Sequence, residues 1–213
     1  MKTAIIAGTS GLIGSQLLEL LVKEQGYDKV IALSRNPLKP ASPKLQNLVV
    51  NFDALWDYAD RLRGDDVFCC LGTTMKRAGS KEAFRTVDFE YPVALASITK
   101  EQGARQFLIV TASGANKDSL IFYNRVKGEV QESIVKIGFE AIHILQPSLL
   151  IGHRTEKRAG EGVATGVMKV LDILIPKKNK AIDPVKVARA MVDLAKKGGK
   201  GTWIHDSGEL QNF

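Results

Sequence analysis

A glycine-rich turn near the start of the chain constrains the fold more than any other feature of this sequence. Gly8, Gly11 and Gly14 follow the apolar run 3–7, and apolar residues recur at helical spacing from Leu12 onward. Glycines at these positions allow a tight strand-to-helix turn and let the backbone approach a diphosphate, while the helix N-terminus offers free N–H groups to an anion. The alternative is a bare strand-to-helix turn with no ligand, but the position between a strand and a helix favours dinucleotide binding. The residues expected to contact the phosphates are Gly8, Thr9, Ser10, Gly11, Leu12, Ile13 and Gly14.

Apolar runs and helical patterns alternate along most of the chain. Strands are expected at 3–7, 29–33, 48–52, 67–71, 106–110, 141–145 and 203–205, and the segments between them include helical patterns at 55–62, 84–102, 123–136, 163–175 and 184–197. Strands joined by helical crossovers predict an α/β fold, a doubly wound parallel-sheet Rossmann fold. Because no linker interrupts the 213 residues, we expect a single domain, with a dinucleotide-binding core at 1–150 and a small C-terminal substrate-side lobe at 151–213.

Charge and composition exclude several classes of protein. The net charge is +7, but Lys and Arg are spread along the chain, so we expect no specific nucleic-acid binding. No apolar run approaches the roughly 20 residues that cross a bilayer, and the first residues do not resemble a signal peptide, so no membrane association and a cytoplasmic location are expected. His143 and His205 have no further ligand at metal-binding spacing, which predicts that there is no metal site.

The residue after the second expected strand indicates the cofactor. An acidic side chain there would bind the ribose hydroxyls of NAD, whereas this chain has Arg35, whose guanidinium suits a 2′-phosphate. NADP(H) is therefore the expected cofactor, with Ser34 as a second donor; the alternative is a solvent-facing arginine without a ligand. Asp53, after the third strand, is expected to accept from the adenine amino group or to serve only as a loop or helix-capping residue. Leu71 and Gly72, after the fourth strand, are expected to flank the dinucleotide.

A tyrosine and a lysine four residues apart indicate a site for acid–base catalysis. On a helix, Tyr123 and Lys127 share one face, and a lysine cation beside a phenol favours proton exchange with a carbonyl or alcohol oxygen. The alternative is a tyrosine that merely packs on a lysine stem. Thr111 and Ser113 follow the fifth expected strand and are competing candidates for the hydroxyl that assists Tyr123.

Four stretches of the chain together resemble the short-chain dehydrogenase/reductases, in particular an atypical branch that includes the Tat-interacting-protein-like oxidoreductases. The stretches are 8–14, 67–74, 114–117 and 123–130, of which the second and fourth are the more specific. The resemblance implies a Rossmann domain that binds NADP(H). It matches the following residues to cofactor-contacting positions: Ser10, Gly11, Leu12, Ile13, Arg35, Leu71, Gly72, Tyr123, Lys127, Leu150 and Arg158. Thr111 stands where the wider family has a serine.

Two functions follow as hypotheses. The first is an NADPH-dependent reductase of a small carbonyl compound or similar small-molecule substrate, with Tyr123 as proton donor and Lys127 as its electrostatic partner. The second is an NADP(H)-responsive regulator or redox sensor, in which the cofactor orders the basic loop 153–158 and the C-terminal lobe for a protein partner. The sequence predicts neither the substrate nor the oligomeric state.

Overall fold

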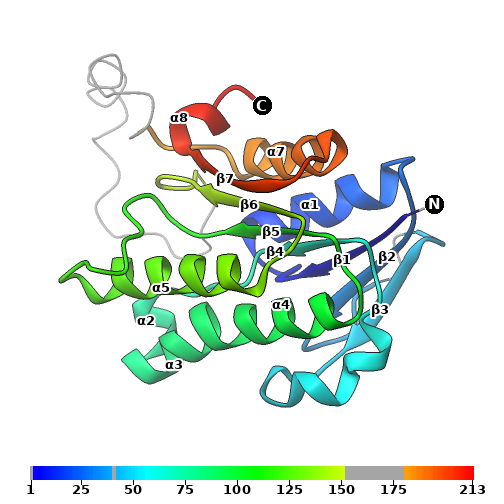
Figure 1. The fold of residues 1–213 in the computed structure, drawn as a ribbon, viewed down its shortest axis with the longest axis horizontal. Helices are drawn as coiled ribbons and strands as arrows, with labels where there is room; N and C mark the ends of the chain where they lie inside the picture. The colour runs from blue at the N-terminus through cyan, green and yellow to red at the C-terminus, as the bar shows by residue number, and fades with distance from the viewer. Residues whose placement is uncertain (1, 40–41, 152–179) are drawn as a thin grey trace.

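A seven-stranded parallel sheet forms the centre of the molecule (Figure 1). The computed structural model describes residues 2–39, 42–151 and 180–213. The strands are β1 Lys2–Ala7, β2 Tyr27–Ser34, β3 Leu45–Val49, β4 Asp66–Cys69, β5 Gln106–Val110, β6 Ala141–Gln146 and β7 Gly201–Asp206. Their order is β3-β2-β1-β4-β5-β6-β7 and every neighbouring pair is parallel. The expected doubly wound Rossmann fold is confirmed.

Helices cover both faces of this sheet (Figure 1). Helices α1 (Leu12–Lys23) and α7 (Pro184–Lys197) lie on one face, and α4 (Tyr91–Glu101) and α5 (Phe122–Ile137) lie on the other. The shorter elements are the 3-10 helix η1 Phe52–Arg61, the helices α2 Met75–Ala78 and α3 Lys81–Arg85, the π-helical turn η2 Thr86–Glu90, and α8 Ser207–Leu210.

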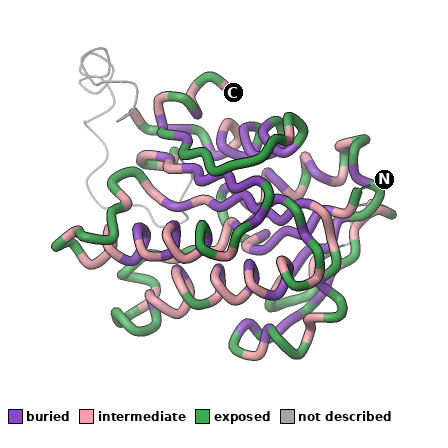
Figure 2. Tube along the Cα trace, in the orientation of Figure 1, coloured by how far each residue is buried: buried purple, intermediate pink, exposed green. Residues whose placement is uncertain are grey.

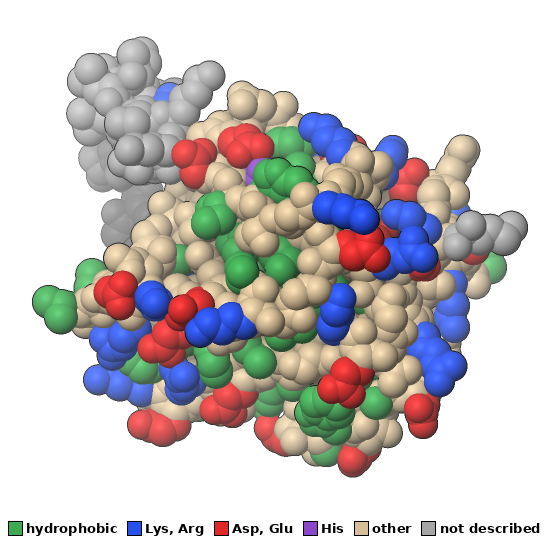
Figure 3. All heavy atoms as spheres, viewed as in Figure 1, with side chains coloured by type: hydrophobic (Ala, Val, Ile, Leu, Met, Phe, Trp, Pro, Cys, Tyr) green, Lys and Arg blue, Asp and Glu red, His purple; other side chains and the backbone are tan. Residues whose placement is uncertain are grey.

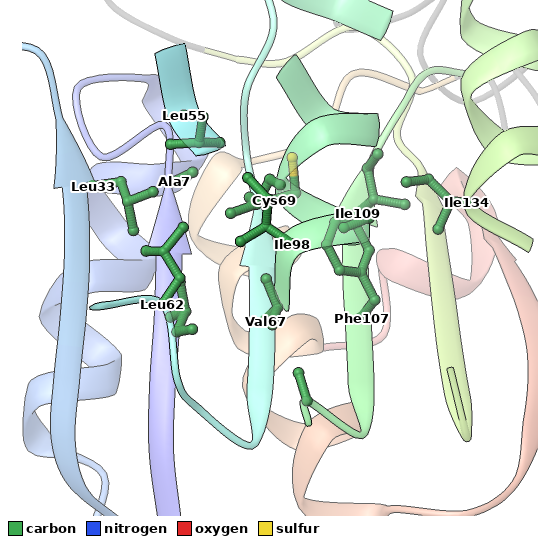
Figure 4. Packing of buried hydrophobic residues seen from close by; sticks show 14 of the residues in the cluster. Ala7, Leu33, Leu55, Leu62, Val67, Cys69, Ile98, Phe107, Ile109 and Ile134 are labelled. Carbon is green, nitrogen blue, oxygen red and sulfur yellow. The ribbon is translucent and has the colours of Figure 1, made fainter. Parts of the chain in front are cut away.

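Strand β1 shows how the apolar runs of the sequence build two cores. Ile5 packs in the cluster that contains the side chains of α4 and α5, whereas its neighbour Ile6 packs in the cluster of α1 and α7. Successive side chains of a strand point to opposite faces, so a strand covered on both sides must be apolar throughout. Figure 2 shows the central strands buried along their length, and Figure 4 shows Val67 and Phe107 directed toward Ile98 of α4.

The strand order reverses at β1 and β4, so their carboxyl ends are the expected place for a ligand. The chain runs outward from β1 through β2 to β3 and then crosses back to β4 on the other side of β1. In open parallel sheets, ligands bind outside the strand ends at the point where this reversal occurs. The turn at residues 8–14 follows β1, and Leu71 and Gly72 follow β4.

Two expected elements differ from the structure. The third strand lies at Leu45–Val49 and not at 48–52, because Asn51 ends the extended segment: its side-chain oxygen accepts from the backbone N–H of Asp53 at 3.1 Å and caps η1. Asp53 therefore lies in the first turn of a helix. The expected helix at 84–102 is interrupted by the π-helical turn η2, which separates α3 from α4.

The described part of the C-terminal segment belongs to the same layered structure. Strand β7 pairs with β6, and α7 packs against α1 over the sheet. The expected basic loop 153–158 and helix 163–175 lie outside the described residues, and the division at residue 150 stays a prediction. In the part of the chain that the structure describes, there is no helix with the length and apolarity that a membrane span requires.

His143 and His205 lie side by side, a contact that their positions in the sequence do not indicate. Nδ1 of His143 lies 3.0 Å from Nε2 of His205, and Nδ1 of His205 lies 2.8 Å from a carboxylate oxygen of Glu209. The two histidines are 62 positions apart and meet only because β6 and β7 are adjacent strands. Both rings are buried and belong to the core of the protein.

Candidate cofactor and active site

Close backbone contacts require glycine at two of the three glycine positions of the first turn. Gly8 has a φ of 91°, and a Cβ added to it would lie 2.4 Å from the carbonyl oxygen of Cys70. A Cβ on Gly14 would lie 2.1 Å from the carbonyl oxygen of Gly8, whereas one on Gly11 would lie 3.3 Å from the same atom. Gly8 and Gly14 therefore hold the turn against β4 and α1, and Gly11 has more room.

Helix α1 begins with backbone donors that no side chain of the described residues caps. Its first position is preceded by Gly11, which has no side chain to cap the helix, and no acidic residue stands in the first turn. Ser10, Gly11 and Leu12 are exposed at this end of the helix, while Thr9 and Ile13 are buried. Free N–H groups next to glycine backbone fit the diphosphate of a dinucleotide.

Arg35 lies exposed after β2, close to a pair of hydrogen-bonded side chains. The hydroxyl of Tyr91 donates to Asp53 Oδ1 at 2.5 Å. Burial and this hydrogen bond raise the pKa of Tyr91 to about 12, and the positive charge of Arg35 opposes the rise. Arg35 itself has no hydrogen bond or ion pair within the described residues. A cation thus stands near Asp53 at the strand end where the adenosine half of the cofactor is expected.

The hydroxyl of Ser34 is already occupied. It donates to the carbonyl oxygen of Asn36 at 2.6 Å and accepts from Nδ2 of Asn47 at 2.8 Å. Asn47 also accepts from the N–H of Leu38, so it fixes the loop that carries Arg35. A phosphate contact from Ser34 would require the bond to Asn36 to open, and this second donor stays a prediction.

Lys127 forms a buried ion pair with Asp88, a residue that the sequence analysis did not single out. Its Nζ lies 2.7 Å from Asp88 Oδ1, and the two side chains are 6% and 0% exposed. Burial raises the pKa of Asp88, and the charge of Lys127 and the backbone N–H of Thr73 oppose this effect. The feature of the sequence that could have revealed Asp88 is a carboxylate four residues after Phe84, on the otherwise apolar face of a helical pattern.

The ion pair lies beside the loop that follows β4. Asp88 Oδ2 accepts from the N–H of Thr73 at 2.8 Å, and a Cβ on Gly72 would lie 3.3 Å from Asp88 Oδ1 and 3.5 Å from Lys127 Nζ. Gly72 is exposed and Leu71 is half-buried against the core. The structure thus brings the expected residues Gly72 and Lys127 together.

Tyr123 lies on α5, one turn before Lys127, and is half-buried. Its ring packs against Phe84 of α3 with 5.4 Å between centroids, so Tyr123 and Lys127 both face the segment formed by α3 and η2. The phenol hydroxyl makes no hydrogen bond to another described residue. It is therefore available to a ligand oxygen.

The two candidate hydroxyls after β5 have different surroundings. Thr111 is buried; its hydroxyl accepts from Gln131 Nε2 at 2.8 Å and donates to the carbonyl oxygen of Leu145 at 3.3 Å. Ser113 is exposed, and its hydroxyl has no partner among the described residues. Thr111 thus belongs to a core network, whereas Ser113 faces the outside of the loop.

Gly128 brings that loop close to α5, which the sequence analysis also missed. A Cβ on Gly128 would lie 2.1 Å from the backbone nitrogen of Lys117. The N–H of Asn116 donates to the carbonyl oxygen of Asn124 at 3.0 Å, so the loop crosses the helix in direct contact. A glycine after the lysine of the 123–127 motif was the available signal.

Leu150 lies at the edge of the described structure, where it forms a parallel bridge with Ile182 and is half-buried. Arg158, the other cofactor residue that the family resemblance implied near the C-terminus, lies outside the described residues.

Comparisons with known proteins agree with this geometry. Residues 8–150 match the model of a family described as NAD(P)H-binding. Protein HTATIP2 of Rattus norvegicus is 35% identical over 167 residues, which cover 76% of this chain and 69% of that protein. Protein FMP52, mitochondrial, of Candida albicans is 29% identical over 206 residues, covering 93% and 90%. The protein of the same name from Coccidioides immitis is 30% identical over 220 residues, covering 95% and 89%.

Solved structures show the same fold at low sequence identity. A UDP-N-acetylglucosamine 4-epimerase from Methanobrevibacter ruminantium M1, in complex with UDP-N-acetylmuramic acid, has a TM-score of 0.70 and 15% identity, over 96% of this chain and 76% of that one. MoeE5 in complex with UDP-glucuronic acid and NAD has a TM-score of 0.72 and 15% identity, over 95% and 75%.

The fold, the glycine turn and the family match define an NAD(P)H-binding Rossmann protein whose cofactor is a nicotinamide dinucleotide. The chain belongs to this family, and within it to the atypical short-chain dehydrogenase/reductases of the HTATIP2 branch. The resemblance seen in the sequence is therefore confirmed.

The expected cytoplasmic location is contradicted by the relatives. The fungal proteins that match most of the chain are named mitochondrial. The expectation rested on the residues of this chain alone, in which an address read by a targeting receptor need not resemble a membrane segment.

Proposed function

We propose that the protein is an NADPH-dependent reductase that acts on a small carbonyl compound. The observation that carries this proposal is the ammonium group of Lys127. Its Nζ is buried beside Gly72 at the carboxyl end of β4 and, within the described residues, makes a polar contact only with Asp88. An ammonium group has three donors, so two remain for the oxygens of a ligand.

The cofactor contacts follow from the positions of the residues. The backbone of the glycine turn and the N-terminus of α1 bind the diphosphate, and Arg35 binds the 2′-phosphate, which selects NADPH over NADH. The two free donors of Lys127 bind hydroxyl groups of the nicotinamide ribose. Asp53, with the Tyr91 hydroxyl on one of its oxygens, keeps its second oxygen for the adenine amino group.

Tyr123 supplies the proton in this proposal. NADPH supplies the hydride to the carbonyl carbon when it is bound. The phenol of Tyr123, which has no partner among the described residues, donates its proton to the carbonyl oxygen as negative charge develops there. The Lys127 cation on the same helix face stabilises the phenolate that results. Ser113 orients the substrate oxygen in this proposal, because the hydroxyl of Thr111 is already hydrogen-bonded within the core.

The test combines binding and turnover. Titration with NADPH and NADH establishes cofactor binding and preference, and a panel of small aldehydes and ketones, followed by loss of NADPH absorbance, establishes the reaction. Tyr123→Phe is expected to bind NADPH normally and to lose at least a hundredfold in kcat, about the contribution of a positioned proton donor. Tyr58→Phe is the matched control, because Tyr58 lies on η1 and accepts from the N–H of Asn51. Full turnover by Tyr123→Phe would refute the assignment.

A further inference from the structure

We propose that Asp88 is a positioning residue for the nicotinamide half of the site and that it acts through Lys127. The proposal rests on the proposed function, because it assigns a role in cofactor binding to Lys127. Asp88 itself need not touch the cofactor. Its carboxylate holds Lys127 Nζ at 2.7 Å and the N–H of Thr73 at 2.8 Å, and thereby joins α5 to the loop after β4.

The geometry explains why the lysine needs such a partner. A lysine side chain has several rotatable bonds and a large rotamer entropy, and a buried ammonium without an opposite charge is costly. Asp88 removes both problems, since it neutralises the charge and fixes Nζ beside Gly72. The carboxylate is itself fixed by the backbone of Thr73 and by its complete burial.

The backbone around Asp88 supports the same role. Asp88 lies in the π-helical turn η2 between α3 and α4. Single π-helical turns are uncommon and occur frequently at functional sites. Phe84 and Asp88, four residues apart, contact Tyr123 and Lys127, which are also four residues apart. One segment of chain therefore sets the positions of both residues of the proposed catalytic pair.

Gly72 shows how little space the arrangement leaves. Any side chain at this position would stand within 3.5 Å of both charged groups. The exposed backbone of the β4 loop thus lies directly over the ion pair. A ligand in contact with Gly72 would therefore lie next to Lys127 Nζ, whose position Asp88 fixes.

The experiment compares two ligands and three variants. The ligands are NADPH and adenosine 2′,5′-bisphosphate, which carries only the adenosine half and its 2′-phosphate. The variants are Asp88→Asn, Lys127→Met and the double variant, each tested by calorimetric titration and by thermal unfolding. Asp88→Asn is expected to weaken NADPH binding by about 10- to 100-fold, the value of a hydrogen bond to a charged group, and to leave binding of the bisphosphate unchanged.

The double variant separates positioning from a structural role. If Asp88 acts through Lys127, adding Asp88→Asn to Lys127→Met changes the NADPH Kd by no more than about twofold, because the group that Asp88 positions is already absent. Thermal stability should fall in Asp88→Asn, which leaves Lys127 without its counter-ion, and recover in the double variant, in which both charges are removed.

The results that overturn the proposal are distinct from those that overturn the proposed function. Wild-type protein that binds neither ligand would refute the proposed function. Wild-type protein that binds NADPH, with a folded Asp88→Asn variant that binds it equally well, would refute the role of Asp88 alone. Equal weakening of both ligands would show general damage and also refute it. If Asp88→Asn does not fold, the comparison of Lys127→Met with the double variant decides, since a further loss in the double variant contradicts the proposal.

Discussion

Gly14 and Gly8 touch across the first turn so closely that a Cβ on Gly14 would lie 2.1 Å from the carbonyl oxygen of Gly8. Neither backbone is free to move, because Gly8 is also held against the carbonyl of Cys70. The glycine spacing in the sequence therefore serves two purposes. Gly8 and Gly14 allow the turn to fold, and Gly11, which has more space, leaves the approach to the helix N-terminus open for a ligand.

This difference predicts unequal effects of two alanine substitutions. Gly14→Ala should lower the free energy of unfolding by about 3 kcal/mol or more, because the added methyl overlaps backbone that cannot shift. Gly11→Ala should lower it much less, since Gly11 has a φ of −82° and its added Cβ would lie 3.3 Å from the carbonyl oxygen of Gly8, a tight contact without overlap, but it should weaken NADPH binding by obstructing the diphosphate. Urea unfolding and NADPH titration of both variants test this, and equal stability loss in the two would contradict it.

Arg35 predicts the cofactor preference. Arg35→Asp should weaken NADPH binding by about 10- to 100-fold, because charge-assisted hydrogen bonds to the 2′-phosphate are lost, while NADH binding is retained or improved. Lys29→Asp makes the same change of charge at the opposite end of the same strand, where Lys29 is exposed, and should leave the ratio of the two Kd values unchanged. An unaltered ratio in Arg35→Asp would refute the preference for NADP(H).

The positions of helices and strands could be predicted from the sequence where the local residue pattern and the burial agree. The elements β5, β6, α5 and α7 lie at their expected positions, since buried parallel strands are apolar throughout and both helices have an apolar face with clear end signals. The expected strand at 48–52 was displaced because its apolar residues continue past the point where Asn51 caps η1. Apolar character alone does not show where a ladder ends.

The candidate site was less accessible from the sequence, because its parts meet through tertiary contacts. Asp88 is brought to Lys127 by a π-helical turn, a backbone irregularity that a helical pattern does not reveal. Gly128 is needed only because the loop at Lys117 crosses α5. Neither contact follows from residue spacing, whereas the i,i+4 relation of Tyr123 to Lys127 does.

The surroundings of the two hydroxyls predict that Ser113 and Thr111 have different roles. Ser113→Ala should lower kcat on a carbonyl substrate and leave stability unchanged, because its hydroxyl has no partner within the described residues. Thr111→Val should lower the free energy of unfolding by about 1–3 kcal/mol, since Gln131 Nε2 then loses its acceptor in the core. Kinetics and urea unfolding of both variants distinguish these outcomes. A loss of kcat in Thr111→Val that exceeds the loss in Ser113→Ala would reverse the assignment.

The buried His143 predicts how stability depends on pH. Burial and the neighbouring His205 lower the pKa of His143 from 6.5 to about 4, and Glu209 opposes this; the stacked Trp203 carries no charge. The folded state therefore binds fewer protons than the unfolded state between these values. The contribution of neutral His143 to the free energy of unfolding is therefore complete above pH 6.5. It is lost as the pH falls toward 4, by at most about 3 kcal/mol at roughly 1.4 kcal/mol per pH unit.

His143→Phe tests this prediction, because phenylalanine keeps a ring against Trp203 and removes the titrating group. Urea unfolding at pH 7 and pH 4.5 should show a smaller difference in the free energy of unfolding for His143→Phe than for the wild-type protein. The comparison uses the change between the two pH values, so any general effect of the substitution on stability cancels. Identical differences in the two proteins would show that acid destabilisation arises from other groups.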